Sequence, residues 1–206
     1  MVDNYEKAKG ESSEWRTPAA ILNPIGLRYG LDPCAPQSVY CAVRARKVFT
    51  VADNGLLQSW RGYGLVFVNP PWSEQKRAVV PWLRTFFAES DGGIFVCVAR
   101  TSSDWWHQLV LPHSELICFP TGKTRFIKPD GSPGPSPTNG IALLARGAVA
   151  CAALRRSGLG FCLPVDRSAA PPRTLPAEVV CGRSSTAAPA PPKTNDLFVE
   201  GRRSHE

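Results

Sequence analysis

The feature that most constrains the fold is a short apolar run that ends in two prolines. Residues 65–68 read Leu-Val-Phe-Val, and Asn69-Pro70-Pro71-Trp72 follow directly. The β-branched and aromatic residues predict a strand that is buried on both faces. Proline lacks a backbone N–H and fixes φ, so the two prolines end the strand and prevent an immediate helix. The sequence therefore predicts a stiff loop at the carboxyl end of a buried strand, where ligands bind in open parallel α/β sheets.

An amide and an aromatic ring in such a loop suit methyl transfer to an exocyclic amine of a nucleobase. The lone pair of such an amine is delocalised into the ring, so the amine is a poor nucleophile. The side-chain oxygen of Asn69 and the carbonyl of Pro70 can each accept one N–H and direct the lone pair at the methyl group, while Pro71 stiffens the loop. Trp72 can stack on an extruded base. An amide is no general base, so orientation and proximity would carry the catalysis.

The same four residues also fit an ordinary turn after a core strand, and that alternative stays open for the tetrapeptide alone.

A chain of 206 residues can form one domain with a full core and extra segments. Its formal net charge is +7, and most of the excess lies in residues 1–165. This sign suits a phosphate-binding surface, although a basic globular domain would show it too.

Cysteine spacing and terminal composition predict a reducing, cytoplasmic location. None of the seven cysteines forms a Cys-x-x-Cys pair, and the histidines are not paired, so we expect neither a metal site nor a disulfide framework. Cys97 and Cys118 have apolar neighbours and are expected to be reduced core thiols. The polar N-terminus does not resemble a signal peptide, and no apolar tract reaches the length of a membrane span.

Strands alternate with helices along the chain, which indicates a doubly wound α/β sheet. Helices are expected over 19–27, with Thr17 as the cap and Pro18 at the first helical position, over 78–89 and over 103–111; strands are expected up to Asp32 and over 47–51, 65–68, 94–99 and 115–119. Residues 125–127 and 141–145 are predicted to pair as an antiparallel hairpin at the end of the sheet. Residues 1–14 are expected to be disordered, residues 15–165 to form the domain, and residues 166–206 to be a low-complexity, disordered tail.

Two aspartates follow the first two predicted strands. Asp32 and Asp53 are 21 positions apart, and in nucleoside-binding α/β folds an acid at about that separation binds the ribose hydroxyls. An Asp before Pro or before Asn-Gly is also a routine turn residue, and this is the better interpretation of Asp53 taken alone.

Several motifs in this order resemble the phage-type Dam family of DNA N6-adenine methyltransferases. They are Trp15-Arg16-Thr17-Pro18, Leu31-Asp32-Pro33-Cys34-Ala35, Asp53-Asn54-Gly55-Leu56, Trp60, Asn69-Pro70-Pro71-Trp72, the run from Ala99 to Trp106, Gly122-Lys123-Thr124-Arg125-Phe126 and Ser136-Pro137. The resemblance covers about residues 14–163, and the ordered combination is more specific than any single motif.

The resemblance implies a Rossmann-like sheet that binds S-adenosylmethionine as the methyl donor. By this resemblance Thr17 and Pro18 would lie by the donor carboxylate, and Asp32, Pro33, Cys34 and Ala35 would line its methionine portion. Asp53 would face the ribose or adenine, and residues 69–72 would hold the target adenine. The turn after the first predicted strand reads Asp-Pro-Cys-Ala-Pro and has no Gly-x-Gly, which departs from the wider methyltransferase pattern.

Spacing also bears on how double-stranded DNA would be recognised. Only 33 residues separate Ala35 from Asn69, which is too few for a DNA-recognition domain. The candidates for DNA contacts are therefore residues 100–107 and 121–128, with Arg100, Lys123, Arg125 and Lys128. A solvated basic face is the alternative for each of these residues. Of Trp105 and Trp106, one is expected in the core and the other near the site, because neighbouring helix residues point in different directions.

Other functions stay open at this point. The same loop could present a protein glutamine amide or cytosine N4 to the donor, although no peptide-binding domain is evident and Asn69 favours adenine mildly. A non-catalytic nucleic-acid-binding module is a third alternative. Gly122-Lys123-Thr124 is not a phosphate-binding loop for nucleotide hydrolysis, because position 117 is Ile where that motif requires Gly.

Overall fold

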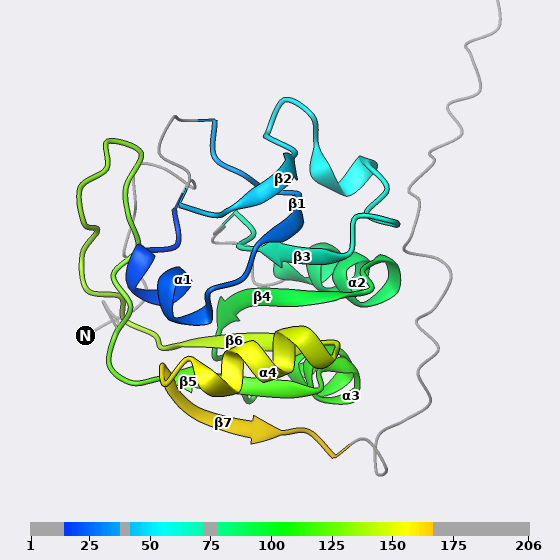
Figure 1. Ribbon diagram of the computed structural model, residues 1–206. Coiled ribbons are helices and arrows are strands. Elements are labelled where there is room, and N and C mark those ends of the chain that lie inside the picture. The colour runs from blue at the N-terminus through cyan, green and yellow to red at the C-terminus, as the bar shows by residue number, and fades with distance from the viewer. Residues whose placement is uncertain (1–14, 38–41, 72–77, 167–206) are drawn as a thin grey trace, which may run out of the picture.

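The structure is a computed structural model that describes residues 15–37, 42–71 and 78–166. In these ranges a mixed sheet lies between two layers of helix (Figure 1). The expected disorder of residues 1–14, nearly all of the predicted tail and the side chain of Trp72 fall outside the described residues.

The elements follow the predicted order, with shifts at their ends. They are α1 (Ala19–Ile25), β1 (Tyr29–Asp32), β2 (Ala45–Val48), the 3₁₀ turn η2 (Gly55–Leu57), β3 (Leu65–Val68), α2 (Val79–Glu89), β4 (Gly92–Val98), the π-helical turn η3 (Trp106–Val110), α3 (Leu111–His113), β5 (Leu116–Pro120), β6 (Ile141–Arg146), α4 (Ala148–Arg156) and β7 (Gly160–Pro164). The apolar run before Asn69 is the predicted strand with the predicted bounds. The sequence analysis assigned no element to α4 or β7.

The sheet has the strand order β2-β1-β3-β4-β6-β5-β7. Strands β2, β1, β3 and β4 are parallel, whereas β6 is antiparallel to both of its neighbours, β4 and β5. Strand β5 therefore runs in the direction of β4. The carboxyl ends of β1 to β5 consequently lie along one edge of the sheet, which we call the carboxyl edge.

The predicted hairpin between residues 125–127 and 141–145 is wrong. Strand β6 pairs with β4 and β5 instead, and Ile127 forms single bridges with Arg16 and with Pro133. The apolar residues of β6 are all buried between two strands, which satisfies their backbone groups and their side chains together. An antiparallel end of the sheet does exist, but β6, β5 and β7 form it.

Helices cover both faces of the sheet. Helices α1 and α4 pack on the face that includes Phe67, Ile94 and Leu143, while α2 and η3 pack on the face that includes Val66, Phe95 and Leu144. Figure 1 shows α1 and α4 in front of the sheet, with α2 and α3 behind it. The central strands β3, β4 and β6 are apolar on both faces because both faces are covered.

The region 103–111 differs from its prediction as a single α-helix. Its backbone forms the π-helical turn η3, which continues into the three-residue helix α3. Trp105 and Trp106 are both buried in the same core cluster, with their ring centroids 5.8 Å apart, and Trp106 stacks near Phe119. Both indoles are therefore core residues, and neither is among the residues that line the cavity described below.

Candidate active site

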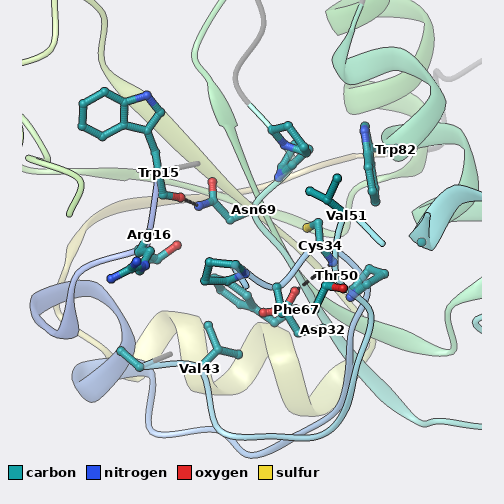
Figure 2. A pocket seen from close by; sticks show the side chains of 18 of the residues that line it. Trp15, Arg16, Asp32, Cys34, Val43, Thr50, Val51, Phe67, Asn69 and Trp82 are labelled. Atoms are coloured by element: carbon teal, nitrogen blue, oxygen red, sulfur yellow. Dashed lines mark hydrogen bonds between the residues drawn. The ribbon is translucent and has the colours of Figure 1, made fainter. Parts of the chain in front are cut away.

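A cavity of about 310 Å³ opens at the carboxyl edge, beside the ends of β1, β2 and β3. This volume falls at the lower end of the range for small-molecule sites. Six segments of the chain supply its lining, which consists of Trp15, Arg16, Thr17, residues 32–36, Ala42, Val43, Thr50, Val51, Asn54, Gly55, Phe67, Asn69, Pro70, Pro71 and Trp82 (Figure 2). The cavity therefore brings together Thr17, the turn after β1 and the loop after β3, which are far apart in the sequence.

Asn69 follows β3 and lies half-buried at the cavity wall. Strand β3 holds it firmly, because Val66, Phe67 and Val68 are fully buried between β1 and β4. The amide nitrogen of Asn69 donates a hydrogen bond of 2.6 Å to the carbonyl of Trp15, which fixes the orientation of the amide plane (Figure 2). Pro70 and Pro71 line the cavity next to it, as predicted for the loop.

The turn after β1 places a buried carboxylate at the cavity. Asp32 is only 3% exposed, and its Oδ1 accepts a 3.1 Å hydrogen bond from the backbone N–H of Cys34. Burial raises the pKa of this carboxyl to about 7, and the hydrogen bonds from Cys34 offset only part of that effect. Pro33, Cys34 and Ala35 line the cavity beside Asp32. A turn of this kind can bind a cationic or hydrogen-bond-donating group.

The turn after β2 packs directly against the turn after β1. A side-chain carbon at Gly55 would lie 1.9 Å from the carbonyl oxygen of Pro33, so only glycine allows this approach. The backbone adds two links, from Phe49 N–H to the carbonyl of Asp32 and from Ala35 N–H to the carbonyl of Phe49, each 2.9 Å long. The two turns thus form one wall of the cavity.

Asp53 is exposed and is not among the lining residues. Its Oδ2 accepts hydrogen bonds from the backbone N–H and the hydroxyl of Thr50, at 2.8 and 2.9 Å, and these bonds lower the pKa of the carboxyl. Thr50, Val51 and Asn54 of the same turn do line the cavity. The structure therefore gives Asp53 a role in holding the turn, and its predicted contact with the ribose or adenine stays a prediction.

Thr17 and Pro18 differ in what they contribute. Pro18 occupies the cap position of α1 and lies outside the lining, so the predicted cap at Thr17 is shifted by one residue. Thr17 lines the cavity, and its hydroxyl is buried with no hydrogen-bond partner among the described residues. A buried hydroxyl without a partner is costly, which suggests that a bound molecule supplies the partner.

The sequence analysis did not include several lining residues among its site residues. Trp15 and Arg16 stand next to Thr17 in the motif that carries the resemblance, so their position in that motif could have indicated them. Val43 and Trp82 also line the cavity. Val43 lies just before β2, and Trp82 lies in α2. No local pattern marks these two, because only the packing of distant segments brings them to the cavity.

The four basic residues predicted to contact DNA are all exposed. Arg100 follows β4 and Lys123 follows β5, so both lie at the carboxyl edge, where the cavity opens. Arg125 and Lys128 belong to the loop of residues 121–140, which we call the basic loop. The backbone of Arg16 pairs with Ile127 in this loop. Exposed cations and the cavity therefore share one edge of the sheet.

Comparison with protein-family models supplies the deciding observation. The model of DNA N-6-adenine-methyltransferase (Dam) matches residues 5–145, which is more than half of the chain. The chain belongs to the Dam family. It is accordingly an adenine-specific DNA methyltransferase, and the matched range includes every segment that lines the cavity. No curated protein and no solved structure matched the chain.

The enzyme's described residues also bear on membrane association. Within residues 15–37, 42–71 and 78–166, none of the helices combines the length and the apolar character that crossing a bilayer requires. The range matched by the family model also includes the whole of the basic loop.

Proposed function

We propose that this enzyme transfers the methyl group of S-adenosylmethionine to N6 of an adenine that is flipped out of double-stranded DNA. The observation that carries the proposal is the meeting of the Asp32 turn, the Thr50–Gly55 turn and Asn69-Pro70-Pro71 around one cavity. The first two segments would bind the donor and the third would bind the acceptor. The fold would then be a doubly wound, Rossmann-like methyltransferase sheet.

The lining residues fit this donor. A carboxylate at Asp32 suits an ammonium group or hydroxyls, and the hydroxyl of Thr17 can pair with a polar group of the ligand. Apolar groups of Pro33, Ala35 and Phe67 can pack against the remaining surface. When bound, S-adenosylmethionine would supply an electrophilic methyl group on a sulfonium.

The acceptor side depends on the Asn69 loop. In our proposal the side-chain oxygen of Asn69 and the carbonyl of Pro70 each accept one N–H of the adenine amine. The hydrogen bond from the Asn69 amide nitrogen to Trp15 supports this role, because it fixes the plane of the amide in advance. Trp72 is proposed to stack on the base, although it lies outside the described residues.

Exposed basic residues at the carboxyl edge would hold the duplex. Arg100, Lys123, Arg125 and Lys128 can contact phosphates, and an arginine among them can also contact guanine edges. A base must leave the helical stack to enter a cavity of this kind, because its amine is otherwise paired. Family membership favours adenine over the cytosine-N4 and glutamine acceptors and over a module that only binds DNA.

The reaction can be tested by transfer of tritiated methyl groups to unmethylated duplex DNA, followed by nucleoside analysis. We expect the label in N6-methyladenine. Label in N4-methylcytosine or in protein would contradict the proposed acceptor. If the same sequence is labelled only when it is supplied as single-stranded DNA, the proposed duplex substrate is contradicted. Calorimetric titration with S-adenosylmethionine checks the donor separately, and an absence of binding would refute it.

Asn69→Ala provides the sharpest variant. We expect methyl transfer to fall by about a hundredfold or more, because the amine loses the oxygen that orients it. Binding of S-adenosylmethionine is expected to persist in the same protein. Asn23→Ala is a matched control, since Asn23 is exposed on α1 and does not line the cavity. A folded Asn69→Ala enzyme with a normal rate would refute the mechanism.

A further inference from the structure

Residues 15–17, which we call the connecting segment, lie between the basic loop and the loop after β3 that begins with Asn69. They precede α1 in the chain, yet they contact two regions that lie more than 50 and more than 100 residues away in sequence. Each of these contacts is a hydrogen bond or a close packing contact. The connecting segment is therefore the physical link between the proposed DNA-binding surface and Asn69.

On the loop side, Arg16 makes three hydrogen bonds. Its backbone N–H donates to the carbonyl of Ile127 and its carbonyl accepts from the N–H of Ile127, both at 2.9 Å. The guanidinium Nη2 donates to the carbonyl of Pro129 at 2.6 Å. Arg16 is only 5% exposed, which makes these contacts costly to lose. The part of the basic loop that includes Lys128 is thus held to the connecting segment by backbone and by side chain.

Trp15 adds a packing contact with the same loop. A side-chain carbon at Gly134 would lie 2.5 Å from Cζ3 of the Trp15 ring and 2.8 Å from the carbonyl oxygen of Phe126. The backbone N–H of Gly134 donates to that carbonyl at 2.7 Å. The indole ring of Trp15 therefore packs closely against the backbone of the basic loop at Gly134. A displacement of either the loop or the ring would move the other.

On the catalytic side, the carbonyl of Trp15 accepts the 2.6 Å hydrogen bond from the amide nitrogen of Asn69 (Figure 2). The same residue thus packs against the basic loop with its ring and holds the catalytic amide with its backbone. A displacement of about 1 Å in a reacting group can slow a reaction by about a hundredfold. The position of the Asn69 amide consequently depends on contacts made by the loop.

We propose that the connecting segment sets the position of Asn69 according to the position of the basic loop, with Arg16 and Gly134 as positioning residues. This inference rests on the proposed function, because it takes Lys123, Arg125 and Lys128 of the basic loop as DNA contacts and Asn69 as the acceptor's ligand. DNA that orders the loop would at the same time order the amide. The methyl-transfer step would then be fast only when the basic loop is bound to DNA.

Gly134→Ala tests the packing contact. The added methyl must push the Trp15 ring or the loop, so we expect the single-turnover rate at saturating DNA and donor to fall about tenfold. Gly140→Ala is the matched control, because it makes the same change in the same loop where no atom lies within 4 Å. We expect the wild-type rate for Gly140→Ala and an unchanged donor affinity for both variants.

Arg16 provides an independent variant pair. Arg16→Met keeps the apolar stem and removes the donor to Pro129, so kcat at saturating donor and DNA is expected to fall. Because Arg16 also lines the cavity, donor affinity is measured separately for each variant. Arg16→Lys retains a donor and is expected to recover part of kcat. Thermal unfolding of each variant measures how much protein is folded, and rates are compared per folded molecule. If Gly134→Ala does not fold, the Arg16 pair decides the question.

Two results would overturn the inference. One is an equal rate for Gly134→Ala and Gly140→Ala, and the other is an equal loss of kcat in Arg16→Met and Arg16→Lys. Failure of the proposed function gives a different result, because the wild-type enzyme would then produce no N6-methyladenine in the same assay.

Discussion

Asp32 and Asp53 are the same residue type at the ends of neighbouring strands, yet their environments are opposite. Asp32 is buried at the cavity, and burial raises its pKa to about 7. Asp53 is exposed, and the hydrogen bonds from Thr50 lower its pKa. One carboxylate is thus desolvated and directed to the cavity, whereas the other is solvated and bound to its own turn.

The difference shows that spacing along the sequence does not assign a role. Both aspartates follow strands and precede turn residues, as ligand-binding acids and turn acids both do. The turn after β1 directs its carboxylate inward, where the backbone N–H of Cys34 donates to Oδ1. The turn after β2 closes on its own carboxylate and presents Thr50, Val51 and Asn54 to the cavity.

The largest expected effect comes from Asp32→Asn. We expect the affinity for S-adenosylmethionine at pH 8 to fall about a hundredfold, or roughly 3 kcal/mol, because the polar group of the donor that pairs with Asp32 loses the carboxylate. Calorimetric titration of wild-type and variant protein at that pH measures it. Unchanged affinity would show that Asp32 is a structural residue and would end the contrast with Asp53.

A second expected effect concerns stability and pH. The pKa of Asp32 is about 7 in the folded protein, well above the ordinary value of 3.8 that the carboxyl has in the unfolded chain, so the unfolded chain loses this proton at lower pH. The contribution of Asp32 to the free energy of unfolding is therefore present below pH 3.8 and is lost as the pH rises towards 7, by up to about 4 kcal/mol.

Asp32→Asn isolates this contribution, because other titrating groups remain in both proteins. We expect the variant to be as stable as wild type near pH 4 and more stable at pH 8 in the absence of the donor. Urea unfolding at several pH values measures the difference. A difference that does not depend on pH would contradict the buried, protonated Asp32.

The smallest expected effect comes from Asp53→Asn. The turn after β2 would keep a side-chain acceptor for Thr50, so the affinity for S-adenosylmethionine is expected to change by less than about threefold. The same titration measures it. A loss as large as that of Asp32→Asn would instead support the contact with the donor that the sequence predicts for Asp53.

Regular elements with strong local signals were predictable. The buried run of residues 65–68 became β3 with the predicted bounds, and the helix predicted over 78–89 is α2, which ends at the predicted residue. The pairing of β6 was not predictable, because an apolar strand of this kind can pair with any open edge. The shared burial of Trp105 and Trp106 was likewise missed, since a π-helical turn changes the directions in which successive side chains point.

The sequence by itself determined the kinds of chemistry present and the order along the chain of strands β1 to β6. Two prolines after β3 require a stiff loop at Asn69, and the ordered motifs indicate the family that the comparison confirms. Only the tertiary structure decided which carboxylate faces the cavity and that Trp15 holds the Asn69 amide. These contacts join residues far apart in the chain, and their geometry depends on how the whole sheet brings its carboxyl ends together.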